Sequence, residues 1–297
     1  MKKENDLLEE TLAVAEGGYD AAYRFLMGEY TQNPEGCGPQ TLYFLACLAG
    51  GAGMPQDALK WLRKAVEENG WWYRPEVLED DDLAQISDDP AFALLKSVSD
   101  SRYAQAVSTA RAVFTWERKK ADRLFIAVHG NTQNGQTARE DWSPILGDNA
   151  LWQLETVQSA EPDGYGTYRW SYDAESFLPV TEAMQRVANE GYGQVVCGGF
   201  SAGCDMLLRA VAYTPARCDA LILQSPWIPM LDDGAEELLK ALRQKGIELR
   251  ILCGECDEDC LPPAKRLYEA AAGAKIAVKL TVQQGSRHQF PERPFDL

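Results

Sequence analysis

The pattern of apolar and polar positions divides the chain into two parts. Residues 1–115 are rich in Ala and Leu and show the period of amphipathic helices. Within 41–50, one helical face carries Leu42, Leu45, Ala46 and Ala49. A second helical stripe carries Ala58, Leu62, Ala65 and Val66. We therefore expect a small all-helical domain over residues 1–118.

Two segments of the helical part resemble each other, 20–26 (DAAYRFL) and, 37 residues later, 57–63 (DALKWLR). Gly18 and Gly53 precede them and suit tight turns between helices. This arrangement resembles a degenerate tetratricopeptide repeat over residues 4–70, a helix–turn–helix unit of about 34 residues. Such units usually stack in threes or more, so we expect a helical domain that packs against its neighbour. The alternative is a module that binds a protein partner.

From about residue 120 the pattern changes to short apolar runs that alternate with amphipathic segments. The apolar runs are Leu124–Val128, Gln194–Cys197, Ala220–Leu223, Leu249–Cys253 and Ala277–Val282. The amphipathic segments are Glu175–Asn189, Cys204–Tyr213, Gly234–Lys245 and Pro263–Ala271. This alternation predicts an α/β domain over residues 119–297, with a mostly parallel sheet covered by helices on both faces. The charged stretch 117–122 is the expected linker.

The charge of the chain limits its partners. Asp and Glu number 45 against 29 Lys and Arg, a formal net charge of −16, and the densest basic cluster is 118–120. Nucleic acids and anionic membranes both select basic surfaces, so we expect neither as a partner. The N-terminal MKKENDLLEE lacks the apolar core of a signal peptide, and no stretch approaches the ~20 apolar residues of a membrane span. We expect a cytoplasmic protein with reduced cysteines.

Histidine and cysteine usage limits the metal chemistry. The chain has two histidines, His129 and His288, which excludes a multi-histidine metal centre. Cys253, Cys256 and Cys260 follow the spacing C-x2-C-x3-C, but no second CxxC pair supplies further ligands. We therefore expect no metal and no cofactor. A metalloprotein that uses these three cysteines is kept as an alternative.

The strongest chemical motif is Gly199-Phe200-Ser201-Ala202-Gly203, between a predicted strand and a helical segment. A serine on such a sharp turn is held in strained backbone geometry with its hydroxyl exposed. The two glycines are needed because side chains there would collide with the neighbouring strand and helix. Ser201 is the candidate nucleophile; the alternative is a glycine-rich turn with an incidental serine.

A serine hydroxyl needs a base, and the usual order for this motif is Ser, then an acid, then His. His288, in the loop after the last predicted strand, is the only histidine downstream of Ser201. The orienting acid should follow the preceding strand, where Cys253–Asp259 offers four carboxylates. We choose Asp257 for its Gly-x-x-Asp spacing, with Asp259 and Glu255 in reserve.

The oxyanion that such a nucleophile generates needs hydrogen-bond donors. One is the backbone amide of Ala202, the residue after the nucleophile. The other is expected in the loop 129–134 (HGNTQN), from the amide of Asn131 or Thr132. His129 then has a structural role in this loop; its use as the general base is the alternative.

Together, Val128-His129-Gly130, Gly199–Gly203, Gly254-x-x-Asp257 and Gly285-x-x-His288 resemble the α/β-hydrolase superfamily over residues 120–297. The loop and the serine turn look most like its carboxylesterase, polyhydroxyalkanoate depolymerase and dienelactone hydrolase branches. The resemblance implies a serine hydrolase that cleaves a small ester, thioester or amide through an acyl-serine intermediate, with a small acyl compound as substrate. Two alternatives stay open: a repeat-type interaction protein with an inactive hydrolase domain, and a serine peptidase of the same fold.

Overall fold

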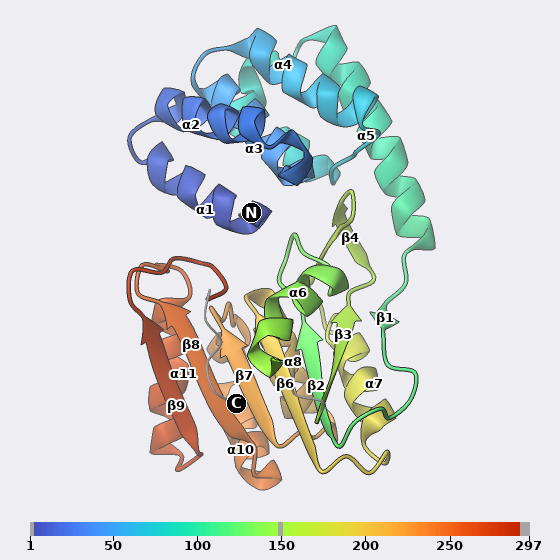
Figure 1. Ribbon diagram of the computed structural model, residues 1–297, viewed down its shortest axis with the longest axis vertical. Coiled ribbons are helices and arrows are strands. Elements are labelled where there is room, and N and C mark those ends of the chain that lie inside the picture. Colours follow the sequence, from blue (N-terminus) through green and yellow to red (C-terminus); the bar gives the residue numbers. More distant parts are fainter. Residues whose placement is uncertain (1–2, 148–150, 292–297) are drawn as a thin grey trace. The chain divides into compact units, whose positions relative to one another are not determined.

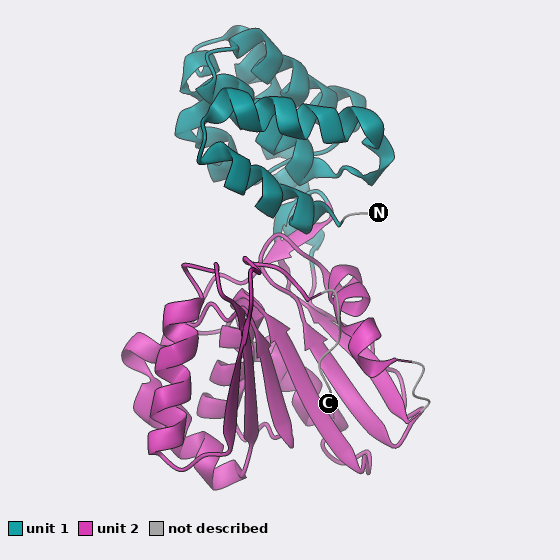
Figure 2. Cartoon of the chain, turned by 60° about the vertical axis from the view of Figure 1, so that its left-hand side comes forward, with its two compact units in different colours: residues 1–110, 162–165 teal, residues 111–161, 166–297 magenta. Residues whose placement is uncertain are grey.

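The computed structural model of the protein describes residues 3–147 and 151–291. The chain divides into two compact units (Figure 2). Unit 1 holds the residues up to Ala110 together with Pro162–Tyr165, and unit 2 holds Arg111–Glu161 and the residues from Gly166 onward. The predicted boundary at 118/119 differs from this division, because residues 113–120 already bond to the sheet of unit 2. The predicted linker 117–122 therefore lies inside unit 2.

Unit 1 is helical, as the sequence predicts. Its α-helices are α1 (Glu4–Ala15), α2 (Tyr19–Gln32), α3 (Pro39–Gly51), α4 (Pro55–Arg63) and α5 (Pro90–Thr109). A π-helical turn continues α4 over Lys64–Glu68, and 3-10 turns cover Pro34–Gly36, Pro75–Glu79 and Asp81–Ile86. The pairs α1–α2 and α3–α4 form helical hairpins where the two repeat copies are predicted. Their assignment to the tetratricopeptide class stays a prediction.

Side-chain caps and close approaches of the backbone define the packing of unit 1. The carboxylate of Glu4 accepts hydrogen bonds from the amides of Gly38 and Thr41 at 2.8 and 2.9 Å, which satisfies free donors at the start of α3. Gly50 allows α3 to approach the 3-10 turn, because a Cβ there would lie 2.0 Å from the carbonyl oxygen of Asp82. The hydroxyl of Tyr19 donates to the Asp82 carboxylate at 2.7 Å.

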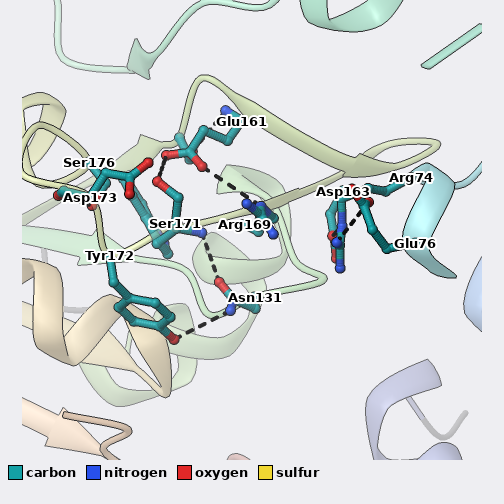
Figure 3. Close-up of polar contacts among 12 residues, drawn as sticks. Arg74, Glu76, Asn131, Glu161, Asp163, Arg169, Ser171, Tyr172, Asp173 and Ser176 are labelled. Atoms are coloured by element: carbon teal, nitrogen blue, oxygen red, sulfur yellow. Dashed lines mark hydrogen bonds and ion pairs between the residues drawn. The ribbon is translucent and has the colours of Figure 1, made fainter. Parts of the chain in front are cut away.

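The segment 162–165 is part of unit 1 although its neighbours in sequence belong to unit 2. The amide of Arg74 donates to the carbonyl of Asp163 at 3.0 Å, and the amide of Tyr165 donates to the carbonyl of Trp72 at 2.9 Å. The guanidinium of Arg74 also pairs with the Asp163 carboxylate at 2.9 Å (Figure 3). The backbone bonds and the ion pair thus fix this segment within unit 1.

Unit 2 contains a seven-stranded sheet in the order β1-β3-β2-β6-β7-β8-β9 (Figure 1). Its strands are β1 (Val113–Phe114), β2 (Arg123–Val128), β3 (Trp152–Gln158), β6 (Gln194–Phe200), β7 (Ala220–Gln224), β8 (Glu248–Gly254) and β9 (Val278–Gln283). All neighbours are parallel except β1 and β3. The five predicted strands are confirmed as β2, β6, β7, β8 and β9. The sequence did not predict β1, β3 or the small sheet of β4 (Glu161–Gly164) and β5 (Thr167–Arg169).

Helices cover both faces of this sheet, and alternate residues of the inner strand β2 enter two different apolar cores. Leu124, Ile126 and Val128 of β2 belong to one core, and Phe125 and Ala127 belong to the other. The first core is covered by α7 (Leu178–Val187), α8 (Ala202–Tyr213), α10 (Ala235–Lys245) and α11 (Leu261–Gly273). The second is covered by α6 (Gly135–Leu146) and Phe290; a short helix, α9, spans Met230–Asp233.

The arrangement, a parallel sheet with helices on both faces after a helical region, is that of the predicted α/β-hydrolase fold. The strand β6 is the central member of the seven, and the loop after its carboxyl end begins with Ser201. Among the described residues, none of the helices has the length and apolarity needed to cross a membrane.

Candidate active site

Ser201 occupies a strained turn between β6 and α8. Its φ is 50° and its ψ is −121°, a backbone conformation that residues with a Cβ rarely adopt. The amide of Ser201 donates to the carbonyl of Gln224 at 3.0 Å, and the carbonyl of Ser201 accepts from the amide of Cys204 at 3.0 Å. The turn is thus fixed from both sides, by the neighbouring strand β7 and by the first turn of α8.

The two glycines of the motif are required by this turn. A Cβ on Gly199 would lie 2.8 Å from backbone atoms of Gly203 and Cys204. A Cβ on Gly203 would lie 2.5 Å from the carbonyl oxygen of His129. These distances are too short for any side chain, so strand, helix and the loop after β2 meet here only because both positions are glycine.

His288 and Asp257 form a hydrogen-bonded pair. The Nδ1 atom of His288 lies 2.9 Å from Oδ2 of Asp257, which joins the loop after β9 to the loop after β8. The Asp257 side chain is 2% exposed, whereas 28% of the His288 side chain remains accessible. Since a carboxylate can only accept, Nδ1 carries the proton and Nε2 is left as the basic nitrogen.

The reserve acids are placed differently. Glu255 is exposed, and its carboxylate accepts the amide of Gly285 at 3.0 Å, at the start of the histidine loop. Asp259 is exposed as well. Of the acids that the sequence offered in this loop, Asp257 is the one that the structure brings to the imidazole.

The environment of Asp257 keeps it ionised. Burial raises the pKa of this carboxyl, but the hydrogen bond from His288, the charge that His288 carries when protonated, the amide of Cys260 and the hydroxyl of Ser225 outweigh burial. The pKa of Asp257 is therefore held below its ordinary value. Ser225, a fully buried residue after β7 with a φ of 44°, is a partner that the motif spacing did not predict.

The histidine loop and the serine turn lie side by side. The ring of His288 packs against Phe200, the residue before Ser201, with 5.1 Å between the ring centroids. A Cβ on Gly130 would lie 3.2 Å from Cβ of Ser201, so the loop after β2 also reaches the turn. The loop after β2 thus reaches Ser201, the histidine loop contacts the residue before it, and Asp257 joins through His288.

His129, at the start of the loop after β2, is fully buried. Its Nδ1 lies 2.6 Å from the carbonyl oxygen of Gly130, and its Nε2 accepts the amide of Ser159 at 3.1 Å. A carbonyl can only accept and an amide can only donate, so the ring is neutral with its proton on Nδ1. Burial lowers the pKa of His129 to about 4. A neutral ring with both nitrogens engaged cannot act as the general base.

This histidine orients the peptide group between Gly130 and Asn131. The carbonyl of a trans peptide points away from its N–H, so the bond to His129 turns the amide of Asn131 in the opposite direction. The neighbouring amide of Gly130 is occupied by Oε1 of Gln133 at 2.8 Å. The indole of Trp170 donates to the carbonyl of His129 at 2.9 Å and stacks on its ring. Gln133 and Trp170 were not expected from the sequence.

The predicted oxyanion donors have distinct surroundings. The side chain of Asn131 accepts the amide of Trp170 at 2.8 Å and lies 3.5 Å from the hydroxyl of Tyr172 (Figure 3). Thr132 is exposed, has a φ of 60°, and donates its hydroxyl to the carbonyl of Asn131 at 2.6 Å. The third predicted donor, Ala202, is the first residue of α8, where backbone amides have no partner within the helix.

The cysteines around Asp257 do not form the three-cysteine cluster of the metalloprotein alternative. Cys253 and Cys260 are buried, whereas Cys256 is exposed. Within the ranges 3–147 and 151–291, three potential ligand side chains converge as a possible metal-binding group: Asp257, Cys260 and His288. The sulfur of Cys260 lies 3.5 Å from Nδ1 of His288.

Comparison with known proteins gives one family model and several similar solved structures. Residues 3–107 match the model of a family described as "A/B hydrolase-like, N-terminal domain". No curated protein matches the chain. Among solved structures, an uncharacterized protein from Bacillus cereus ATCC 10987 is 26% identical with a TM-score of 0.54, over 98% of this chain and 94% of that one. A Bacillus cereus carboxylesterase is 16% identical with a TM-score of 0.45, over 65% and 93% of the two chains.

The sheet order, the strained serine between the central strand and its helix, and the helical N-terminal family model agree on one assignment. The chain has the α/β-hydrolase fold, and its residues 3–107 match the N-terminal domain of an A/B hydrolase-like family.

Proposed function

We propose that the protein is a serine hydrolase that cleaves a small ester or thioester through an acyl-enzyme on Ser201. The observation that carries the proposal is the combination of a strained serine turn with a hydrogen-bonded His288–Asp257 pair packed against it. A serine turn alone is a common motif, and an Asp–His pair alone is a common ion pair. Their convergence on one strand end supplies nucleophile, base and orienting acid together.

In the acylation step, the hydroxyl oxygen of Ser201 forms a bond to the carbonyl carbon of the substrate. His288 takes the hydroxyl proton on Nε2, and Asp257 stabilises the imidazolium that results. The low pKa of Asp257 supports this role, because a carboxylate that stays ionised does not compete for the proton. His288 then gives the proton to the leaving alcohol or thiol as the carbon–heteroatom bond breaks.

The tetrahedral oxyanion needs two donors, and we assign them to the amides of Ala202 and Asn131. Ala202 follows the nucleophile and lies at the positive end of the helix dipole of α8. Asn131 adjoins Gly130, which lies against Ser201, and its amide is turned away from the buried His129. The amide of Thr132 is the less favoured assignment, since it lies one residue farther from Gly130.

Deacylation repeats the proton transfers with water as the nucleophile. His288 accepts a proton from water, the hydroxide oxygen attacks the acyl carbon, and the proton returns to Ser201 as the acid departs. Trp227 is 42% exposed and its amide lies 3.3 Å from the carbonyl of Ser201, so its indole is a candidate wall for the acyl group.

Turnover of p-nitrophenyl acetate, p-nitrophenyl butyrate and an acetyl thioester tests the proposal. We expect hydrolysis by the unmodified chain and loss of at least ~10⁴-fold of kcat/KM in Ser201→Ala. Ser143→Ala, at an exposed position of α6, serves as the matched control. Hydrolysis of peptide anilides but not of esters would favour a serine peptidase. No turnover by folded protein would favour an inactive scaffold with an interaction role.

We also propose a cytoplasmic location and a protein partner for the helical unit. The eight cysteines are all free, which suits a reducing compartment. The helical hairpins α1–α2 and α3–α4 are the expected binding elements, as in repeat-type interaction domains. Pull-down with the full chain mutated at exposed positions of these helices, against the unmodified chain, tests the second part.

A further inference from the structure

We propose that Asp257, Cys260 and His288 form an inhibitory binding site for a thiophilic divalent metal ion, with Zn²⁺ as the ion that fits best. The site uses one carboxylate oxygen, one sulfur and one imidazole nitrogen, and these atoms all lie within 4.8 Å of one another. It lies on the candidate catalytic pair, yet metal binding there does not depend on the protein being a hydrolase.

The distances between the ligand atoms are close to those of a tetrahedral zinc site. Zinc bonds of about 2.3 Å to sulfur and about 2.0–2.2 Å to nitrogen and oxygen place neighbouring ligands roughly 3.3–3.6 Å apart. The sulfur of Cys260 lies 3.5 Å from Nδ1 of His288, and Nδ1 lies 2.9 Å from Oδ2 of Asp257. These two distances are within a few tenths of an ångström of tetrahedral edges, and the third, from the Cys260 sulfur to the Asp257 carboxylate, is within 4.8 Å.

The chemistry of the ligands selects the ion. A thiolate and an imidazole favour zinc over magnesium and calcium, which prefer oxygen ligands. Asp257 and Cys260 are nearly inaccessible, at 3% and 1% exposure, whereas the His288 side chain is 28% accessible. The ion would therefore enter from the imidazole side, where a water molecule can complete its coordination.

The proton transfers that accompany metal binding explain why a bound metal ion would inhibit the proposed hydrolase. The metal forms a bond to the Cys260 sulfur, and the thiol proton passes to solvent. The metal also takes the Nδ1 lone pair of His288, so the imidazole proton moves through solvent from Nδ1 to Nε2. The ring stays neutral, but its Nε2 is now protonated and cannot accept a proton from Ser201. Asp257 gives up its hydrogen bond and becomes a metal ligand.

Cobalt(II) spectroscopy and zinc inhibition test the site in the full-length chain. Co²⁺ is the probe because Zn²⁺ has a filled d shell and is spectroscopically silent. We expect tetrahedral d–d bands and a sulfur-to-cobalt charge-transfer band in the unmodified chain, both displaced by Zn²⁺. Cys256→Ala, four residues away at an exposed thiol, is the matched control and should keep both.

In Cys260→Ser the charge-transfer band should disappear and the apparent Zn²⁺ affinity should fall by ~100-fold or more, since loss of even an outer-shell partner costs about 10–100-fold. His288→Gln should lose the tetrahedral bands as well and provides a second variant if Cys260→Ser fails to fold. Esterase turnover, normalised to the metal-free rate of each variant, should be blocked by Zn²⁺ in the unmodified chain and restored by a chelator.

Two results would overturn the site. The first is a Co²⁺ spectrum of the unmodified chain without a sulfur band. The second is a sulfur band that survives in Cys260→Ser and is lost in Cys256→Ala. The spectra also separate this inference from the proposed function. A chain that binds Co²⁺ through Cys260 but hydrolyses nothing would keep the metal site and refute the hydrolase. A chain that hydrolyses esters but gives no sulfur band would support the hydrolase and refute the metal site.

Discussion

The loop after β2 and the loop after β9 each carry one of the two histidines, and they hold it in opposite ways. His129 is fully buried between a carbonyl and an amide of the backbone, which fixes a neutral ring. His288 has a carboxylate on one nitrogen and keeps part of its ring accessible. The group that faces Nδ1 therefore distinguishes the two histidines. A backbone carbonyl fixes His129 as a neutral structural donor, whereas the buried carboxylate of Asp257 suits the proposed role of His288 as the base.

Matched substitutions at the two histidines give the largest contrast. His288→Gln should lower kcat/KM by ~10⁴–10⁶-fold, because the serine then has no base. His129→Gln should lower it by no more than ~10³-fold, the cost of one misplaced oxyanion donor. Steady-state esterase kinetics measure both, with circular dichroism as the folding control. Equal losses in two well-folded variants would remove the distinction between the loops.

The carboxylate partner of His288 should have the next largest effect. Asp257→Asn keeps the shape of the side chain but removes the charge that stabilises the imidazolium, so we expect kcat to fall by ~10³–10⁴-fold. Asp259→Asn, two residues away and exposed, should retain activity close to that of the unmodified chain. The opposite ranking would mean that the other acid orients the histidine in solution.

The pH dependence of folding stability tests the effect of burying His129. The pKa of His129 is about 4 in the folded chain and about 6.5 in the unfolded chain, so only the unfolded state binds this proton as the pH falls between these values. Folding stability should therefore fall from about pH 6.5 to about pH 4, by about 3 kcal/mol from this residue. Urea unfolding at several pH values compares the unmodified chain with His129→Gln, which should lack this contribution. Parallel pH profiles would show that burial of His129 has no such cost.

The smallest expected effect concerns the support of the oxyanion loop. Gln133→Leu leaves the amide of Gly130 without its acceptor, so the loop should lose its geometry in part. We expect kcat/KM to fall about tenfold, or about 1.4 kcal/mol of transition-state stabilisation. Gln136→Leu, exposed on α6, is the control in the same segment. An unchanged rate with Gln133→Leu would assign the loop geometry to His129 and Trp170 alone.

The strands that the sequence predicted each contain a short run rich in apolar residues. The strand β3 was missed because Gln153 and Glu155 interrupt its apolar pattern, although both are buried. The hydroxyl of Thr115 donates to the Glu155 carboxylate, and Nε2 of Gln153 donates to the carbonyl of Arg118 at 2.9 Å. These partners come from the segment at the predicted domain boundary. The alternation of apolar and polar residues does not predict a buried polar strand whose hydrogen-bond partners lie far away in sequence.

The candidate site also contains residues that the sequence predicts and residues that it does not. Ser201, His288 and Asp257 could be chosen from the sequence because each follows a recognisable strand at a fixed spacing. Ser225 belongs to no motif, and Cys260 was singled out only for the spacing of the cysteines; their contacts with Asp257 become visible only when the strand ends meet. The bond between His129 and the amide of Ser159 likewise joins residues 30 positions apart through the pairing of β2 with β3. Contacts set by sheet topology are therefore the part that spacing alone cannot supply.

In the proposed mechanism, Ser201 is a nucleophile activated by His288. Incubation of the folded chain with a fluorophosphonate, followed by proteolysis and mass spectrometry, tests it most directly. We expect one phosphonyl group per chain on the peptide that contains Ser201, no adduct in Ser201→Ala, and adduct formation at least ~10³-fold slower in His288→Gln. A folded chain without an adduct, or with its adduct on another residue, would contradict this claim.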